Sequence, residues 1–175
     1  MQSENFAFAQ YVQEAIKELS KPLEEILPQL IPGLSPSELS SAIGKLFFSD
    51  FWFLFLHVAG AERRVKASEA AVLQDILGAL GLTFDAKLVS EGQTLRHLYG
   101  SWRETVTNQH PPEKLSLRIL DALQGYDAQN GTSHTENAKL LFYRMASEIV
   151  SADRKMAEEE KSTLTTLRKF LWSSA

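Results

Sequence analysis

The sequence predicts an all-α fold, a compact helical bundle built around two related helical hairpins. Apolar residues recur along most of the chain at the spacing of one helical face, whereas the alternation typical of a half-buried strand never persists. A short phrase also occurs twice, 91 residues apart: Ala-Glu-Arg-Arg-Val-Lys-Ala-Ser-Glu at 61–69 and Ala-Asp-Arg-Lys-Met-Ala-Glu-Glu-Glu at 152–160. Each copy follows an apolar stretch and opens an amphipathic run, so one helix-turn-helix unit is expected to be used twice.

Residues 1–35 are expected to form an N-terminal helical extension packed on the core. An apolar face at residues 8–19 predicts the first helix. Pro22 is expected to begin a second, short helix that Pro28 disturbs, because proline fits the first turn of a helix but lacks the amide proton that the interior requires. A Pro-Gly pair at residues 32–33 then breaks the chain.

Residues 36–175 are expected to form the main domain, with repeat units near residues 40–82 and 131–172. The tetrad Ser-Pro-Ser-Glu at residues 35–38 is typical of a helix start, with a serine N-cap, proline at the first helical position and a glutamate that closes a capping box. Hydrophobic spacing predicts helices at residues 36–61, from near 68 to 78–81, at 83–107 (one or two), 113–126, 135–152 and 158–172, with a loop at 127–133.

Composition argues against several classes of protein. The 175 residues carry a net charge of −4, so the whole-protein field does not favour nucleic acid, and no nucleic-acid partner is expected. The absence of cysteine excludes disulfides, thiolate metal sites and cysteine nucleophiles. The N-terminus lacks the basic start and apolar region of a secretory signal, and we expect a cytoplasmic location.

One apolar stretch, at residues 47–61, is rich in aromatic residues. It carries Asp50 and His57 and falls short of the ~20 apolar residues that a membrane-spanning helix needs. We therefore expect a buried core helix, with His57 as a core residue, and no transmembrane segment. Aromatic side chains surround this helix on all sides, which is typical of burial on all sides or of a face reserved for a subunit partner.

The repeated phrase places acidic residues at a fixed spacing. Glu62 and Glu69 are seven positions apart, as are Asp153 and Glu160, the spacing of ligand positions five and twelve in an EF-hand calcium loop. Positions one and three of such a loop would fall on apolar or small residues in both copies, which excludes an EF-hand: Val58, Gly60, Ile149 and Ser151. Between the acidic residues, Val65 and Met156 are expected to point inward.

The phrase resembles the TerB-like family, which is associated with tellurite resistance and related stress operons. Members carry a phrase of the type Ala-Asp-Gly-x-Ile-x-x-x-Glu between two helices, often twice in a compact all-helical domain. The matching residues are Ala61, Glu62, Val65 and Glu69, then Ala152, Asp153, Met156 and Glu160, and a downstream Leu-Gly-Leu at residues 80–82. The resemblance covers roughly residues 40–172, and it implies a metal-binding surface at Glu62, Glu69, Asp153 and Glu160.

The chain departs from that family pattern at two positions in the first copy and at one in the second. Arg63 and Arg154 stand where the family has glycine, and Glu62 stands where it has the first aspartate. An arginine beside each carboxylate opposes cation binding, because it forms an internal ion pair. The loss of glycine also indicates that the turn does not need a left-handed residue.

The residues themselves leave three interpretations of the repeated turns open. Glutamates in the first turn of a helix interact well with the helix dipole and the free amides, which is a structural role. The acidic residues could instead hold a divalent cation. In the third interpretation, Arg63, Arg64 and Lys66 accept an anion or a partner near a helix N-terminus.

No catalytic signature accompanies these turns. The chain has no Gly-rich phosphate loop and no nucleophile elbow, and its four histidines are dispersed, so no catalytic residue is expected. The expected function is that of a non-enzymatic, stress-associated protein that binds a partner or a divalent metal through its acidic turns. The alternative is a ligand-free helical scaffold, or a homodimer that uses the aromatic surface of residues 47–55.

Overall fold

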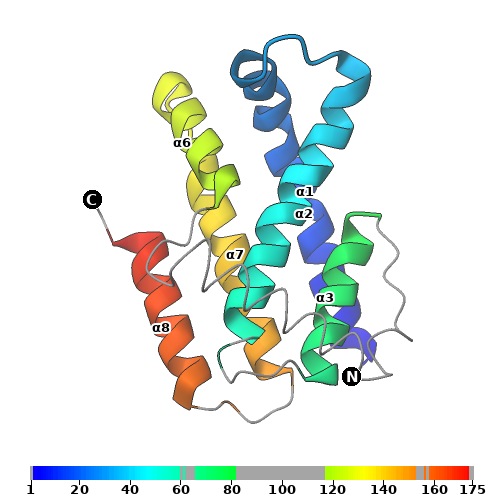
Figure 1. Cartoon of the computed structure of the whole chain (residues 1–175), viewed down its shortest axis with the longest axis vertical. Coiled ribbons are helices and arrows are strands. Elements are labelled where there is room, and N and C mark those ends of the chain that lie inside the picture. The colour runs from blue at the N-terminus through cyan, green and yellow to red at the C-terminus, as the bar shows by residue number, and fades with distance from the viewer. Residues whose placement is uncertain are drawn as a thin grey trace.

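A computed structural model describes residues 2–59, 61, 66–81, 117–152, 156 and 158–173 of the chain, and all secondary structure in these ranges is helical (Figure 1). The helices in these ranges are α1 (Gln2–Leu30), α2 (Pro36–Ala59), α3 (Ala67–Ala79), α6 (Arg118–Asn130), α7 (His134–Ser151) and α8 (Glu158–Trp172). The all-α prediction is confirmed. The helices expected at residues 83–107, and the start of the one expected at residue 113, lie outside the described residues.

The two predicted hairpins are α2–α3 and α7–α8, and each packs its second helix on the first helix of the other. α3 and α8 begin 91 residues apart, the offset of the repeated phrase. The first helices of the hairpins, α2 and α7, pack on each other in the centre, while α3 packs on α7 and α8 packs on α2 (Figure 1). α1 packs on α2, α3, α6 and α7, whereas α6 packs on α1, α2 and α7. The equivalence of the two hairpins therefore does not extend to the helices that precede them.

α1 is one continuous helix, so the expectation of two helices separated near residue 21 is wrong. Both Pro22 and Pro28 lie inside it. An interior proline costs about 3 kcal/mol of helix stability, but Leu19 and Leu23 on either side of the first proline are fully buried against the core. Burial of this apolar face offsets the loss of backbone hydrogen bonds, a gain that local sequence patterns do not report.

The capping box at the start of α2 is half confirmed. The Glu38 carboxylate accepts the Ser35 backbone N–H at 3.1 Å, as a capping box requires. The Ser35 hydroxyl, however, bonds to the side chains of Ser37 and Glu38 rather than to a backbone amide. These hydrogen bonds from Ser35 lower the pKa of Glu38. The helix starts at Pro36, as predicted.

α2 is the core helix that its aromatic residues predict. Phe47, Phe51 and Phe55 are fully buried, and the Phe51 ring meets Phe142 of α7 edge-on at a centroid distance of 5.8 Å. α2 is the one helix in the described ranges that is long and apolar enough to cross a membrane, and half of its most apolar window is buried inside the protein. Among its aromatic rings, Phe48 is 39 % exposed and stacks on Trp52.

The α6–α7 connection is shorter than the predicted loop at residues 127–133. α6 continues to Asn130, so only residues 131–133 separate the two helices. Gly131 has φ of 65°, and its N–H donates to the Asp127 carbonyl at 2.8 Å, which closes the helix end. Polar residues suggested a loop there, but they form the last turn of α6.

Replacing Gly131 with alanine is expected to lower the free energy of unfolding by about 1 kcal/mol, because the left-handed conformation penalises a Cβ. No atom lies within 4 Å of an added Cβ, so the effect isolates backbone conformation. The matched control is Gly44→Ala inside α2, where the space is also open and φ is helical; it should raise stability by about 0.5–1 kcal/mol. Urea denaturation of both variants tests this, and equal effects would contradict it.

Candidate functional site

The two equivalent glutamates of the repeat meet in the interior. Glu69 lies in the first turn of α3 and Glu160 in the first turn of α8, and their exposed fractions are 2 % and 1 %. They are 91 residues apart, the offset of the repeat itself. Because each hairpin packs against the first helix of the other, the same position of both copies is brought to one place. Only Asp50 is comparably buried among the charged side chains of the described ranges.

Lys66 joins the two carboxyl groups. Its backbone N–H donates to Oε2 of Glu69 at 2.5 Å, the backbone half of a capping box. Its ammonium group reaches across to Glu160, with Nζ 3.2 Å from Oε1. The carboxyl groups of Glu69 and Glu160 also hydrogen bond to each other. We call these three residues the glutamate junction.

A hydrogen bond between two carboxyl groups requires that one of them is protonated. The raised pKa of Glu69 explains why it keeps its proton. Burial and, to a smaller extent, the neighbouring Glu160 carboxylate raise the pKa of Glu69 to about 7, against the opposing backbone hydrogen bond and charge of Lys66. Below about pH 7 Glu69 is therefore mostly protonated, and its proton lies in the junction together with the Lys66 ammonium group.

The structure describes half of the predicted metal set. Glu69 and Glu160 come together, whereas Glu62 and Asp153 lie outside the described residues, as do Arg63, Arg64 and Arg154. Within the described ranges, no group of three or more His, Asp and Glu side chains is arranged to hold a metal ion. The described part of the predicted site is thus a pair of carboxyl groups.

One expectation about the repeated turns is wrong. Met156 was expected to point inward between the acidic residues, but its side chain is 42 % exposed. Within the described ranges, the residues of the two copies that come together in the interior are the glutamate pair and Lys66. Val65, the equivalent residue of the first copy, lies outside the described residues.

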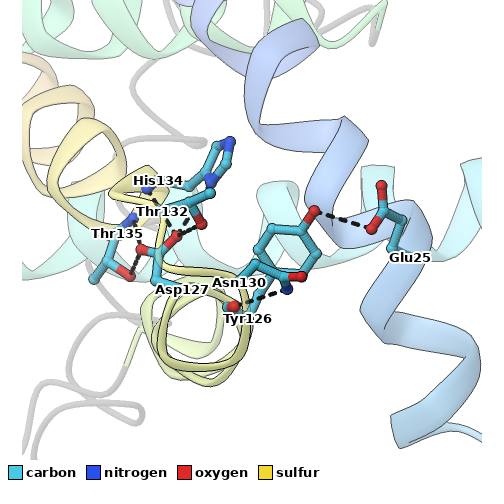
Figure 2. A network of polar contacts seen from close by, with 7 residues as sticks. All are labelled: Glu25, Tyr126, Asp127, Asn130, Thr132, His134 and Thr135. Carbon is cyan, nitrogen blue, oxygen red and sulfur yellow. Dashed lines mark hydrogen bonds and ion pairs between the residues drawn. The ribbon is translucent and has the colours of Figure 1, made fainter.

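A second polar cluster, which the sequence reasoning missed, surrounds Asp127 at the end of α6 (Figure 2). Its carboxylate accepts the backbone N–H groups of His134 at 2.9 Å and Thr135 at 2.7 Å, which caps α7 from outside the helix. The hydroxyls of Thr132 and Thr135 donate to it at 2.6 Å each, and His134 Nδ1 lies 3.1 Å away. The signal for it was an aspartate just before an Asn-Gly turn and a helix start.

The Asp127 cluster is a structural cap without the geometry of a catalytic site. Burial opposes ionisation of Asp127, but the hydrogen bonds from Thr132, Thr135 and His134 outweigh it and hold its pKa well below the usual range. The Thr132 and Thr135 hydroxyls both donate to this carboxylate. A carboxylate with so low a pKa is a weak base, so it does not activate either hydroxyl as a nucleophile. Tyr126 beside it donates to Glu25 at 2.9 Å and ties α6 to α1 (Figure 2).

Asp50 is a buried carboxyl group on the core helix α2. It accepts the backbone N–H of Ile119 at 2.9 Å, in the first turn of α6, whose N-cap residue Leu117 has no side-chain acceptor. Asp50 therefore caps α6 from a neighbouring helix. Burial raises its pKa to about 6, although hydrogen bonds from the Ile119 and Arg118 backbone oppose the rise. His57, two turns further along α2, is half-buried, and burial lowers its pKa.

Of the clusters described, the glutamate junction alone joins the two copies of the repeat. It unites equivalent positions of the repeat, and it is buried. Two buried carboxylates repel each other, so their closeness has an energetic cost that a proton or a nearby positive charge reduces.

Comparisons with protein-family models, with curated proteins and with solved structures give no match to this chain.

Proposed function

We propose that this chain is a non-enzymatic binding protein that holds a divalent cation at the glutamate junction. The observation that carries the proposal is the meeting of Glu69 and Glu160, two buried carboxyl groups from the two copies of one repeated turn. The proposal includes membership of the TerB-like family, a stress-associated role and a cytoplasmic location. The family and the stress-associated role rest on the residue matches at 61–69 and 152–160, and the location rests on an N-terminus without the basic start and apolar region of a secretory signal.

The chemistry of the pair supports a hard cation that keeps part of its water. Carboxylate oxygens suit Mg²⁺, Mn²⁺ and Ca²⁺, and Mg²⁺ is commonly held by one or two carboxylates together with waters. Ca²⁺ takes six to eight oxygen ligands, more than Glu69 and Glu160 provide by themselves. The two-carboxylate junction therefore favours Mg²⁺ or Mn²⁺. Binding would require both carboxyl groups to be ionised, so the shared proton would be released.

A second candidate function is a ligand-free helical scaffold, and the position of Lys66 favours it. Its ammonium group already lies 3.2 Å from Glu160 and supplies one positive charge to the junction. A cation at the same carboxylates would have to displace that group. In the scaffold reading, the proton and Lys66 complete the junction, which then serves to hold the two hairpins together.

Thermal melting with and without metal separates the two candidates. If the junction binds a cation, MgCl₂ or MnCl₂ should raise the melting temperature, because a ligand that binds only the folded state stabilises it, by about 2.7 kcal/mol at a concentration 100 times Kd. The Glu69→Gln/Glu160→Gln double variant should lose this rise. The matched control is Glu158→Gln/Glu159→Gln, which removes two exposed glutamates from the same first turn of α8 and should keep it.

The opposite outcome supports the scaffold. No rise at millimolar metal, or a rise that persists in the Glu69→Gln/Glu160→Gln variant, contradicts cation binding at the junction. Sedimentation of the same samples then tests the homodimer form of the scaffold, which a strict monomer at high concentration would exclude.

A further inference from the structure

A surface groove lies between α6, the first half of α7 and the end of α8, away from the glutamate junction. Its volume is 830 Å³, within the range of ligand-binding clefts. Its lining includes Leu120, Asp121, Glu136, Lys139, Phe170 and Trp172. Phe170 lies ten residues after Glu160 along α8, which is about 15 Å along a helix. The groove is therefore a separate feature from the junction.

The described lining of the groove carries a negative net charge. Its acidic residues are Asp121, Asp127 and Glu136, and Lys139 is the one basic residue among the described lining residues. The Lys139 ammonium is 2.7 Å from Glu136 Oε1 and neutralises that carboxylate. Asp127 serves the cap of α7, as described above. Asp121 is exposed in the first turn of α6 and has no ion pair among the described residues, so it offers its charge to the groove.

The groove also has a fixed aromatic side at the end of α8. The Trp172 indole N–H donates to Glu136 Oε2 at 3.0 Å, and its ring meets the Tyr143 ring edge-on at a centroid distance of 5.6 Å. These two contacts hold the ring in place before any ligand arrives. Phe170 beside it is 40 % exposed, one of the largest apolar side chains left open to solvent in the described ranges. Aromatic side chains fixed in this way are typical anchors of protein interfaces.

From these observations we propose that the groove binds a basic amphipathic segment of a protein partner. Lys or Arg side chains of the segment face Asp121, and its apolar side chains pack on Phe170 and Trp172. The negative charge selects against acidic segments, and the aromatic side selects against purely polar ones. A positive side chain near the face of an aromatic ring gains additional attraction. The proposal does not depend on metal at the glutamate junction.

The test uses fluorescence anisotropy with the full chain and a labelled amphipathic peptide of lysine and leucine. A length of about 14 residues spans about 21 Å as a helix, comparable to one helix of the groove. We expect binding with Kd on the order of 10 μM, the range of a small transient interface. A peptide with glutamate in place of every lysine should bind at least about tenfold more weakly, because it meets like charge.

Two variants and two matched controls locate the binding. Asp121→Lys and Phe170→Ala should each weaken the peptide about tenfold, as loss of an interface anchor does. The controls are Glu158→Lys, which changes the same charge at the far end of α8, and Phe48→Ala, which removes a ring of nearly equal exposure, 39 %, from α2. Both controls should leave Kd within about twofold of the unmodified chain.

Several results overturn the proposal. Absence of binding, equal binding of the glutamate peptide, or equal weakening by the controls would each exclude this groove as a site for basic segments. Melting curves confirm that the variants are folded, and Asp121→Asn serves if the charge reversal unfolds the chain. The Glu69→Gln/Glu160→Gln variant should bind the peptide unchanged, so this test and the metal test fail independently.

Discussion

Replacing Asp127 with alanine is expected to lower the free energy of unfolding by about 3 kcal/mol. Its carboxylate accepts two backbone N–H groups at the start of α7 and two threonine hydroxyls, and it lies beside His134 Nδ1 (Figure 2). Loss of an N-cap costs about 1 kcal/mol, and hydrogen bonds to a charged group contribute about 1.5–3 kcal/mol. The side chain is 12 % exposed, so water replaces these bonds only in part. Urea denaturation with an unchanged m-value measures the loss.

The control for Asp127 lies in the same turn. The Asn130 side chain donates to the Tyr126 carbonyl at 3.0 Å and makes no bond to α7 (Figure 2). Asn130→Ala should therefore cost at most about 1 kcal/mol. If the two alanine variants are equally destabilised, the cap on α7 is not the source of the effect.

The contribution of Asp127 depends on pH in one direction. Its pKa in the folded protein is well below the value of about 3.9 in an unfolded chain, so the unfolded state binds more protons at acidic pH. The stabilisation is fully present above about pH 4 to 5 and is lost as the pH falls toward the folded pKa. The difference between the unmodified chain and Asp127→Ala should therefore be constant at neutral pH and shrink in acid. A difference that grows on acidification would contradict the assignment.

The sequence predicts elements best where an amphipathic face and a clear start coincide. α8 occupies the predicted residues 158–172, because its apolar face repeats without interruption and three glutamates mark its first turn. The sequence instead predicts two helices separated near Pro22, because an interior proline costs helix stability. In the structure they form the single helix α1. The gain that offsets this cost comes from contacts of α1 with α2, α3, α6 and α7, and such contacts between distant segments are not encoded in a local pattern.

In the candidate site, too, the contacts between distant segments could not be predicted from local patterns. The repeat predicts that Glu69 and Glu160 are equivalent, but not that they touch, since that depends on how one hairpin packs against the other. The role of Lys66 was also hidden, because its ammonium group pairs with a residue 94 positions away. Asp127 and Asp50 were missed for a related reason. Each caps a helix to which it does not belong, whereas sequence rules look for the capping residue at the helix start.

Asp50 provides the second large effect, and here the direction depends on the substituent. Asp50→Ala removes the acceptor of the Ile119 N–H and leaves a void at a position that is only 2 % exposed, which is expected to cost about 3 kcal/mol. Asp50→Asn keeps an oxygen for the Ile119 N–H and loses only the ionisable group. The alanine variant should therefore be the less stable of the two at every pH, as measured by urea denaturation.

The pH dependence of Asp50→Asn identifies the buried charge itself. Burial raises the pKa of Asp50 to about 6 in the folded state, above its unfolded value of about 3.9, so the folded state binds more protons between these values. Its contribution to stability is fully present below pH 4 and is lost as the pH rises through 6. Relative to the unmodified chain, Asp50→Asn should thus gain up to about 3 kcal/mol between pH 4 and 7.

The change across this interval is more informative than the absolute stability of Asp50→Asn. The new amide group alters the local hydrogen bonding by a constant amount, because it does not titrate, whereas the ionisation of Asp50 contributes only to the slope. The nearby charges are Arg118, which favours ionised Asp50, and Asp121, which opposes it. Asp121→Asn should therefore reduce the slope slightly and keep its sign. A stability difference that stays constant from pH 4 to 7 would show that ionising Asp50 costs no stability, and the buried acceptor that caps α6 would then not carry a raised pKa.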